Sequence, residues 1–446
     1  MNNYEFYEVV LNNVTLFVSL IFISFILHYL IFRAHVKSIL DPYFLSVISS
    51  VFCAADVFLL YFTDNVSNYE IASYTLTQIA FFLGLYTFSF KKLSFEIIKN
   101  KNFKPDKNYS SKIIGFYFFT ITYLVFIGII YYLKGIPIFM KSRLETFASG
   151  GGTGFLGRIV DISSIISVYL FFSIVKLDKF RARAIPQYFL LILMFITYLL
   201  SGSKGGFFVL FNIVWCYMVF AKIKGRDYLI YINLIKKNIK SLVVVCLIFA
   251  CTIIYVQTNV READPADGGL NPFFALCLRF IHSGDIYWYA YPNDVYLKVS
   301  GEHGFMALFN DTLGLLRIVE WNKLPEAIGY TFKNIHHPSD IPQGPNARHN
   351  IFGLIYYGFF GSIIFSYAIG LLLAFIRNVF PYIVKDNILG GCIFTYLMIR
   401  GATLDSDPML TITFFNNLIF VFPFLFFLYL VVLEFFKSYP GKNERT

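Results

Sequence analysis

Charged residues are scarce in this sequence. Aspartate, glutamate, lysine and arginine together make up 14% of its 446 residues, whereas hydrophobic residues make up 57% and the mean hydropathy is +0.64. Apolar side chains in this proportion exceed what the core of a water-soluble domain can hide. The composition therefore excludes an ordinary soluble protein and predicts a polytopic membrane protein.

Several common functional patterns are also missing. The six cysteines are scattered, with no CxxC or histidine-rich spacing that would indicate zinc, iron or a redox pair, and we expect them to be small buried apolar residues. No P-loop or dinucleotide fingerprint is found, which argues against ATP-driven transport by this chain alone. The start, MNNYEFYEVV, has no lysine or arginine, unlike a cleavable signal peptide, so the first apolar run is expected to stay as an anchor.

Long apolar runs dominate what is present. A helix that crosses the hydrocarbon needs about 20 mostly apolar residues. On this basis we predict an all-α fold with about eleven transmembrane helices. They are expected near residues 12–32, 43–62, 71–90, 113–133, 158–176, 186–203, 205–221, 241–257, 350–376, 386–400 and 408–433.

The basic residues predict the orientation. Of the 37 lysines and arginines, 24 lie in alternate connecting segments, which by the positive-inside rule face the cytoplasm. These segments are 33–42, 91–112, 176–186, 222–240, 377–387 and 436–446. The net charge of +10 is thus mostly a signal of topology, with the N-terminus outside and the C-terminus inside, and not of nucleic-acid binding.

This topology divides the chain into three parts. Residues 1–257 hold the first eight helices and a short outer loop, 134–157; residues 350–446 hold the last three helices and a cytoplasmic tail. Between them, residues 258–349 form an outer loop too long for a plain connector, so short helices of its own are expected there.

One cation that topology does not explain is Lys204 in SGSKGG (201–206). The two arms around this turn have only about 15 to 17 mostly apolar residues each, marginal for a full crossing, so Lys204 is expected at or below the outer surface. The surrounding glycines would let backbone N–H groups approach an oxyanion. The alternative is a plain hairpin turn whose lysine reaches the lipid headgroups.

Arg400 is a similar case. A helix from Asn387 to Ile399 rises about 20 Å, short of the roughly 30 Å of hydrocarbon. Arg400 is therefore expected inside the outer leaflet, where it must face a hydrated cavity or an anionic partner. The alternative is a structural ion pair with Asp405 or Asp407.

Three further acidic positions need an explanation. The triplet DSD (405–407) resembles a metal-binding DxD, but Asp407 before Pro408 equally suits a helix cap, and we favour the cap and predict no metal site. Asp56 lies inside an apolar run, about 10 Å below the loop that begins at Thr63. For Asp56 a carboxylate that pairs with another helix or reaches water is favoured over a proton relay.

The stretch NARHNIFGLIYYGFFG (346–361) places Arg348 and His349 directly before a run without charge. The planar guanidinium of Arg348 suits bidentate phosphate contact, and His349 can accept a proton or, when charged, bind phosphate. Asn350 is expected to cap the following helix, whose N-terminal amides would point at the same spot. A helix start with interfacial polar residues is the alternative. With Lys204 and Arg400, these side chains predict an outward-facing pocket for a polyanion.

The long loop also contains FIHSGDIYWYAYPND (280–294), which is rich in aromatic residues. Flat aromatic faces with polar rims suit sugar rings, and Asp285 could orient or deprotonate a hydroxyl, with Arg279 in the same pocket. The aromatic side chains could equally be the core of the loop or an interfacial belt.

Three stretches resemble the Wzy-type O-antigen polymerases and, more broadly, the O-antigen polymerase and ligase superfamily. GIPIF (135–139), with Arg143 after it, is similar to a Gly-x-Pro segment followed by arginine in an outer loop of that family, and Arg143 with Gly154 fits an R-x10-G pattern. SGSKGG resembles their Ser-Arg-Gly turn, with Lys204 where arginine is usual. ARHNIFGLIYYGFFG resembles their His-Asn segment, which ends the long periplasmic loop. A second R-x10-G is absent from this loop.

The resemblance implies a GT-C-like membrane glycosyltransferase that needs no metal or cofactor. The enzyme would act on the periplasmic side of the bacterial inner membrane and transfer a growing glycan from undecaprenyl diphosphate to a lipid-linked repeat unit. Its partners would be the lipid-linked oligosaccharide, membrane lipid and a chain-length regulator and flippase of the same pathway. The catalytic residues would be His349, Arg348 and Arg400, and the substrate contacts Arg143, Lys204, Arg279, Asp285 and Asn350. His349 could act as the base or hold the diphosphate.

Two other functions remain as alternatives. A ligase of the same superfamily, which transfers the finished glycan to lipid A core or protein, would share the His-Asn stretch, whereas GIPIF favours the polymerase. A flippase for lipid-linked oligosaccharides would need buried charge reachable from both leaflets and pseudo-symmetric halves. The unexplained cations are predicted on one side and no internal repeat is visible, so the enzyme is favoured.

Overall fold

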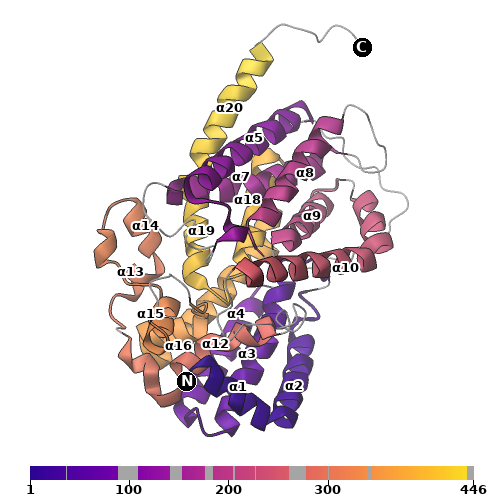
Figure 1. Cartoon of the computed structure of the whole chain (residues 1–446). Helices are drawn as coiled ribbons and strands as arrows, with labels where there is room; N and C mark the ends of the chain where they lie inside the picture. The colour runs from indigo at the N-terminus through magenta and orange to yellow at the C-terminus, as the bar shows by residue number, and fades with distance from the viewer. Residues whose placement is uncertain are drawn as a thin grey trace. The chain divides into compact units, whose positions relative to one another are not determined.

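The computed structural model describes residues 1–36, 38–88, 109–140, 153–175, 184–203, 206–226, 228–260, 278–299, 301–338 and 344–438. Within these ranges every regular element is helical and no strand is present (Figure 1). The chain divides into two compact units. The first consists of Met1–Lys92, Asp264–Tyr382 and Met398–Phe414; the second consists of Leu93–Ala263, Ile383–Leu397 and Phe415–Thr446.

The first unit begins with four helices and continues with the long loop and the helix that follows it. The four are α1 (Asn3–Asn12), α2 (Val14–Phe32), α3 (Phe44–Phe62) and α4 (Asn68–Tyr86). The loop carries η3 (His282–Gly284), α12 (Asp285–Ala290), η4 (Pro292–Lys298), α13 (Gly304–Leu308), α14 (Asn310–Leu315), η5 (Trp321–Lys323) and α15 (Ile328–His336). After it come α16 (His349–Ala374), η6 (Phe375–Val379) and α17 (Phe380–Ile383). The prediction that the long loop has helices of its own is confirmed.

The second unit contains the middle of the chain and its last helix. Its elements are α5 (Tyr109–Lys134), η1 (Pro137–Phe139), α7 (Thr153–Ile174), α8 (Ile185–Leu200), α9 (Gly206–Ile223), α10 (Leu229–Val260) and α20 (Phe422–Ser438). Boundaries between the units fall within α17, α18 (Ile388–Gly401) and α19 (Pro408–Phe420). The GIPIF segment bends at Gly135, whose φ is +90°, and its η1 turn packs against α8 and α10.

Six stretches are long and apolar enough to cross a membrane. They are Val14–Phe32, Phe44–Phe62, Tyr109–Phe139, Gly154–Ile174, His349–Ile383 and Pro408–Ser438. Shorter apolar helices occur at Ile185–Leu200, Phe208–Ile223, Val243–Val256 and Ile388–Gly401. The all-α membrane class is thus confirmed, whereas the count of eleven crossings and the orientation stay predictions.

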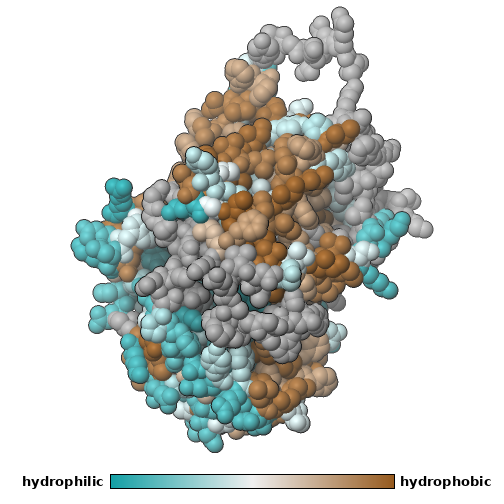
Figure 2. All heavy atoms as spheres, in the orientation of Figure 1, coloured by the Kyte–Doolittle hydropathy of each residue, from teal (hydrophilic) through white to brown (hydrophobic). Residues whose placement is uncertain are grey.

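The surfaces of these helices agree with a lipid environment. On α2 the side chains of Val18, Phe22 and Leu27 are more than half exposed, and α20 similarly exposes Phe424, Phe427 and Phe435. Figure 2 shows apolar side chains, in brown, over the visible faces of α5 and α20, and polar side chains, in teal, over α13 and α14. A large exposed apolar surface of this kind is typical of contact with lipid.

The helix predicted at 350–376 is not continuous, because α16 reverses direction at Gly358. Gly358 has φ +66° and ψ −172°, outside the helical region. His349 Nδ1 lies 2.9 Å from Ser366 Oγ, although the two residues are 17 positions apart in the sequence, and a continuous helix would place them about 25 Å apart. A methyl group on Gly353 would lie 3.0 Å from the Cα of Ser362. We therefore describe α16 as a first arm, 349–357, and a second arm, 359–374, folded back on it.

Glycine at two facing positions brings α4 and the second arm of α16 together. A Cβ added to Gly84 would lie 2.2 Å from the carbonyl oxygen of Tyr367, and one added to Gly370 would lie 2.1 Å from that of Phe81. The two backbones touch there, as glycine allows. This contact fixes the second arm against α4, and through the reversal it positions the first arm as well.

The glycine contact gives a stability prediction. Gly370→Ala should lower the free energy of unfolding by about 1–3 kcal/mol, because the new methyl group overlaps the α4 backbone. Gly128→Ala, on α5, is the matched control: its methyl group meets nothing within 4 Å, so stability should stay unchanged or rise slightly. Thermal unfolding of both variants in detergent, followed by tryptophan fluorescence, checks this. Equal effects at the two sites would contradict the close packing.

Candidate functional site

The first arm of α16 places Arg348, His349 and Asn350 against the middle of two helices. Their side chains reach Ser50 of α3 and Thr77 of α4. Ser50 lies about 9 Å along the axis from the start of α3, and Thr77 about 14 Å from the start of α4. The extended residues 344–348 therefore enter the helical unit, and the first arm begins inside it. Irregular backbone at such a depth is tolerated only where protein or water surrounds it.

Arg348 forms a buried ion pair with Asp405. Arg348 Nη2 is 3.0 Å from Asp405 Oδ2, and the two side chains are 2% and 0% exposed. Ser50 Oγ joins both: it accepts from Arg348 Nη2 at 2.7 Å and donates to Asp405 Oδ2 at 2.8 Å. The N–H of His349 donates to the carbonyl oxygen of Asp405 at 3.2 Å. The ion pair thus joins two irregular segments, 344–348 and 402–407, and Ser50 holds both against α3.

The ion pair reduces the charge that Arg348 can offer to a ligand. Burial raises the pKa of the Asp405 carboxyl, and the Arg348 guanidinium and the Ser50 hydroxyl partly offset that rise. A buried carboxylate beside a guanidinium forms a nearly neutral unit whose strength depends on its remaining hydrogen bonds. Arg348 therefore has a structural role in addition to any role in binding.

His349 is completely buried and has one unused ring nitrogen. Its Nδ1 shares a hydrogen bond of 2.9 Å with Ser366 Oγ, and its ring stacks on Phe81 at 4.8 Å between centroids and 19° between planes. Its Nε2 has no hydrogen-bond partner within the described ranges, and neither has Nε of Arg348. We call Arg348, His349, Asn350 and the side chains that hydrogen-bond to them the cluster. Buried polar atoms are nearly always hydrogen-bonded, so these two atoms leave the hydrogen bonding of the cluster incomplete.

Asn350 does not cap the helix, so that prediction is wrong. Arg348 occupies the N-cap position and makes no side-chain cap bond. The amide of Asn350 is instead used across elements: Oδ1 accepts from the Tyr287 hydroxyl at 2.9 Å, and Nδ2 donates to Thr77 Oγ1 at 2.8 Å. Asn350 therefore ties the first arm to α12 and α4.

Arg400 lies near the end of α18, whose 14 residues are as short as predicted. Its guanidinium carbon lies 4.1 Å from the centre of the Phe414 ring, in cation–π contact. Asp405, one of the two alternative partners expected for Arg400, pairs with Arg348 instead. Asp407 caps α19, since its Oδ1 accepts from the N–H of Leu410 at 3.0 Å, which confirms the cap interpretation of DSD.

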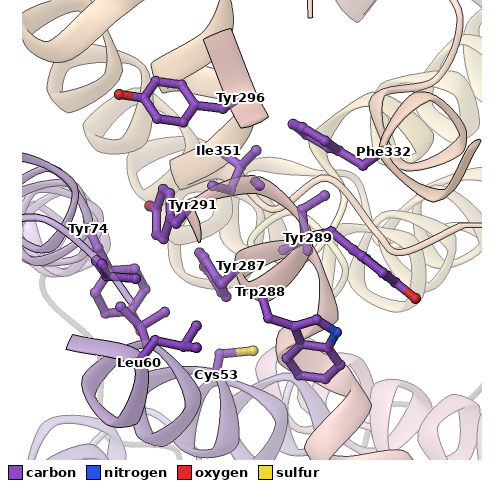
Figure 3. Packing of buried hydrophobic residues seen from close by; sticks show 14 of the residues in the cluster. Cys53, Leu60, Tyr74, Tyr287, Trp288, Tyr289, Tyr291, Tyr296, Phe332 and Ile351 are labelled. Carbon is purple, nitrogen blue, oxygen red and sulfur yellow. The ribbon is translucent and has the colours of Figure 1, made fainter. Parts of the chain in front are cut away.

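The aromatic residues of 280–294 form a core and no open platform. Figure 3 shows Tyr287, Trp288, Tyr289 and Tyr291 packed with Cys53, Tyr74 and Ile351. The four aromatic side chains are at most 2% exposed. Trp288 stacks on Phe6 of α1 at 3.9 Å, and the Tyr289 hydroxyl donates to Asn3 at 2.8 Å. Of the two interpretations of this segment, the structure supports the core.

Asp285 stands beside a second buried carboxyl group. Burial raises the pKa of Asp285 to about 7, although Arg279, whose side chain is exposed, acts in the opposite direction. Asp56 of α3 is fully buried and close enough to interact electrostatically with Asp285. Asp56 also faces Gly284, where an added Cβ would lie 2.1 Å from Asp56 Oδ2. Neither carboxyl oxygen of Asp56 has a hydrogen-bond partner within the described ranges.

The predicted cationic side chains are brought together only in part. Arg348 and His349 are neighbours in one cluster, and Arg400 belongs to the same unit. Lys204 and Arg143 lie outside the described residues, so their approach to this cluster stays a prediction.

Sequence reasoning missed the polar side chains that hold the cluster. They are Ser50, Thr77, Gln78, Ser366 and, as the partner of Arg348, Asp405. The sequence did contain a signal for them, because Ser50, Thr77, Gln78 and Ser366 are polar residues within helices rich in apolar residues. Polar residues in membrane helices mark interhelical hydrogen bonds.

The buried ion pair predicts a non-additive stability effect. Asp405→Leu alone should lower the free energy of unfolding by about 3–5 kcal/mol, because it leaves an unpaired buried guanidinium. The double variant Arg348→Met/Asp405→Leu should recover most of that loss. The exposed pair Lys323–Glu320, also at 3.0 Å, is the control, and its removal should cost less than about 1 kcal/mol. A double variant no more stable than Asp405→Leu would contradict the coupling.

Asp285 predicts a pH dependence of opposite sign to that of most carboxyls. In the folded chain it keeps its proton up to a pKa of about 7, whereas in the unfolded chain it ionises near 4. Its contribution to stability should therefore be complete below about pH 4 and disappear as the pH rises to about 7. Asp285→Asn should flatten this part of the profile, and the exposed Glu320→Gln should not. Identical thermal-unfolding profiles for wild type and Asp285→Asn would refute the assignment.

Comparisons with protein-family models, with curated proteins and with solved structures find no match to this chain. The function must therefore be inferred from the geometry of the cluster and from the three stretches that resemble the polymerases.

Proposed function

We propose that this chain is a membrane glycosyltransferase that polymerises lipid-linked oligosaccharides. The donor would be a glycan on undecaprenyl diphosphate and the acceptor a second lipid-linked repeat unit, on the outer side of a bacterial inner membrane. The observation that carries the proposal is the pair of buried atoms without partners, Arg348 Nε and His349 Nε2, side by side in the chain. They belong to the stretch that resembles the His-Asn segment of the polymerases.

The two atoms suit the two needs of glycosyl transfer. The acceptor hydroxyl attacks the anomeric carbon, the bond from this carbon to the diphosphate oxygen breaks, and the hydroxyl proton must be taken up. A neutral imidazole that donates from Nδ1 to Ser366 leaves the Nε2 lone pair free to take that proton. The N–H at Arg348 Nε can donate to an oxygen on which negative charge grows.

The position of His349 is held from three sides. Phe81 covers the ring, Ser366 holds Nδ1, and the backbone N–H is fixed by Asp405. A base held in this way needs little reorganisation in the reaction, which is the main benefit of a pre-formed site. Because Asp405 neutralises Arg348, further positive charge is needed at the diphosphate. In this proposal Lys204, Arg143 and Arg400 supply it.

The proposal predicts the outcome of a single-substrate assay. The chain in nanodiscs, given one undecaprenyl diphosphate-linked repeat unit, should form a ladder of longer glycans. His349→Ala should slow this by at least about 100-fold, because the proton acceptor is lost. Ser366→Ala should slow it less, because it only loosens the ring. His303→Asn is the control, since His303 is exposed and its φ of +65° suits asparagine.

A normal ladder from His349→Ala would contradict the assignment of the base. If the wild-type chain transferred the glycan only to lipid A core or protein, the ligase would be correct. Movement of the lipid-linked unit across the membrane without elongation would indicate a flippase.

A further inference from the structure

The first unit contains a hollow that the proposed chemistry does not use. This cavity of about 690 Å³ lies where α3 ends and α4 begins, and residues 291–294 of the loop close its other side. Its size is that of a pocket for a small ligand. The turn Asp64–Asn68 forms much of its wall.

Two buried polar groups at the wall of this cavity lack partners. Glu70 is 2% exposed; its Oε2 accepts the N–H of Ser67 at 2.7 Å and so caps α4, whereas its Oε1 has no partner within the described ranges. Tyr291 is 1% exposed, and its hydroxyl likewise has none. Each such group carries a desolvation cost that a ligand with matching hydrogen-bonding groups would remove. The two lie on different elements and line the same hollow.

The charge of the cavity narrows the class of ligand. Its wall has three carboxyl groups, on Asp64, Glu70 and Asp294, and no lysine or arginine. A phosphate or a uronic acid would be repelled. No three metal-ligating side chains of the described residues come together as a metal site. Carboxylates, side-chain amides and tyrosine faces are the groups that bind sugar hydroxyls and ring faces.

We propose that this cavity binds an uncharged, phosphate-free part of a saccharide. A second cavity of about 450 Å³ shares Asn65 and Asn293 with it and continues along α1. Together they would hold more than one sugar residue of a chain.

A series of side-chain contacts links the wall of the cavity to the cluster at His349. The rings of Tyr291 and Tyr287 lie 5.6 Å apart, and the Tyr287 hydroxyl donates to Asn350, the neighbour of His349. If the proposed function holds, on which this assignment rests, the cavity is the place for the sugar end of the acceptor. The diphosphate would stay away from it, on the side of the cations.

The backbone of the wall is held in an uncommon conformation. Asp64, Asn293 and Asp294 all have positive φ, at 57°, 60° and 54°. Such conformations are uncommon for residues other than glycine and persist where the surroundings fix them. The shape of the cavity is therefore set before a ligand arrives.

Two nearly isosteric variants test the assignment in the full chain. Glu70→Gln keeps the cap, because glutamine also serves in a capping box, and removes only the charge. Tyr291→Phe removes only the unpartnered hydroxyl. The probe is an array of neutral and anionic oligosaccharides, with the chain labelled in nanodiscs. We expect binding to neutral glycans, weakened roughly 10-fold by each variant, and a Tm for ligand-free Tyr291→Phe that is unchanged or higher. Glu326→Gln and Tyr4→Phe, both exposed, are the controls.

Each other result overturns the assignment. These results are binding to no glycan, binding only to anionic glycans, binding unaffected by both variants, and Ca²⁺ binding that Glu70→Gln abolishes without any glycan binding. Because the array needs no turnover, it separates this inference from the proposed function. A chain that binds neutral glycans through Glu70 but forms no ladder refutes the polymerase alone. A chain that forms ladders but binds no glycan of the array refutes only the assignment of the cavity as a saccharide site.

Discussion

The ion pair between Arg348 and Asp405 is the interaction on which the rest of the first unit depends. It joins two irregular segments inside a bundle of apolar helices, where each charge alone would be strongly destabilising. Ser50 completes it from α3, and the backbone of His349 hydrogen-bonds to the same aspartate. The geometry of the histidine is therefore a consequence of how the arginine is neutralised.

The reversal at Gly358 explains why a histidine can sit so deep. A helix that crossed the membrane in one pass would place its first residue at the surface. Here the first arm runs from beside Phe81 toward the start of α4, where Phe359 contacts Tyr69. The second arm passes back along α4, with Gly84 and Gly370 in backbone contact. The His349 ring is consequently held between α4 and the second arm, by Phe81 on one and Ser366 on the other.

Much of this architecture could be read from the sequence, because apolar runs and helix caps are local signals. The bounds of α3, α8, α9 and α18 were predicted within a few residues. The helix before Arg400 is as short as predicted, and Asp407 caps its helix as expected. The reversal could not be read, because a single glycine in an apolar helix has the same local pattern whether it kinks, packs or turns. For the same reason Asn350 was assigned to a cap, when its partners Thr77 and Tyr287 are far away in sequence. Long-range polar contacts need the fold.

The proposed function requires that the unpartnered atoms of Arg348 and His349 receive the substrate. A structure of the chain in lipid, with an undecaprenyl diphosphate sugar whose transferable bond cannot break and with an acceptor glycan, tests it most directly. We expect an acceptor hydroxyl within hydrogen-bond distance of His349 Nε2, a diphosphate oxygen near Arg348, and no phosphate in the acidic cavity beside Glu70. Both substrates bound elsewhere, with His349 Nε2 and Arg348 Nε still sealed in protein, would contradict it.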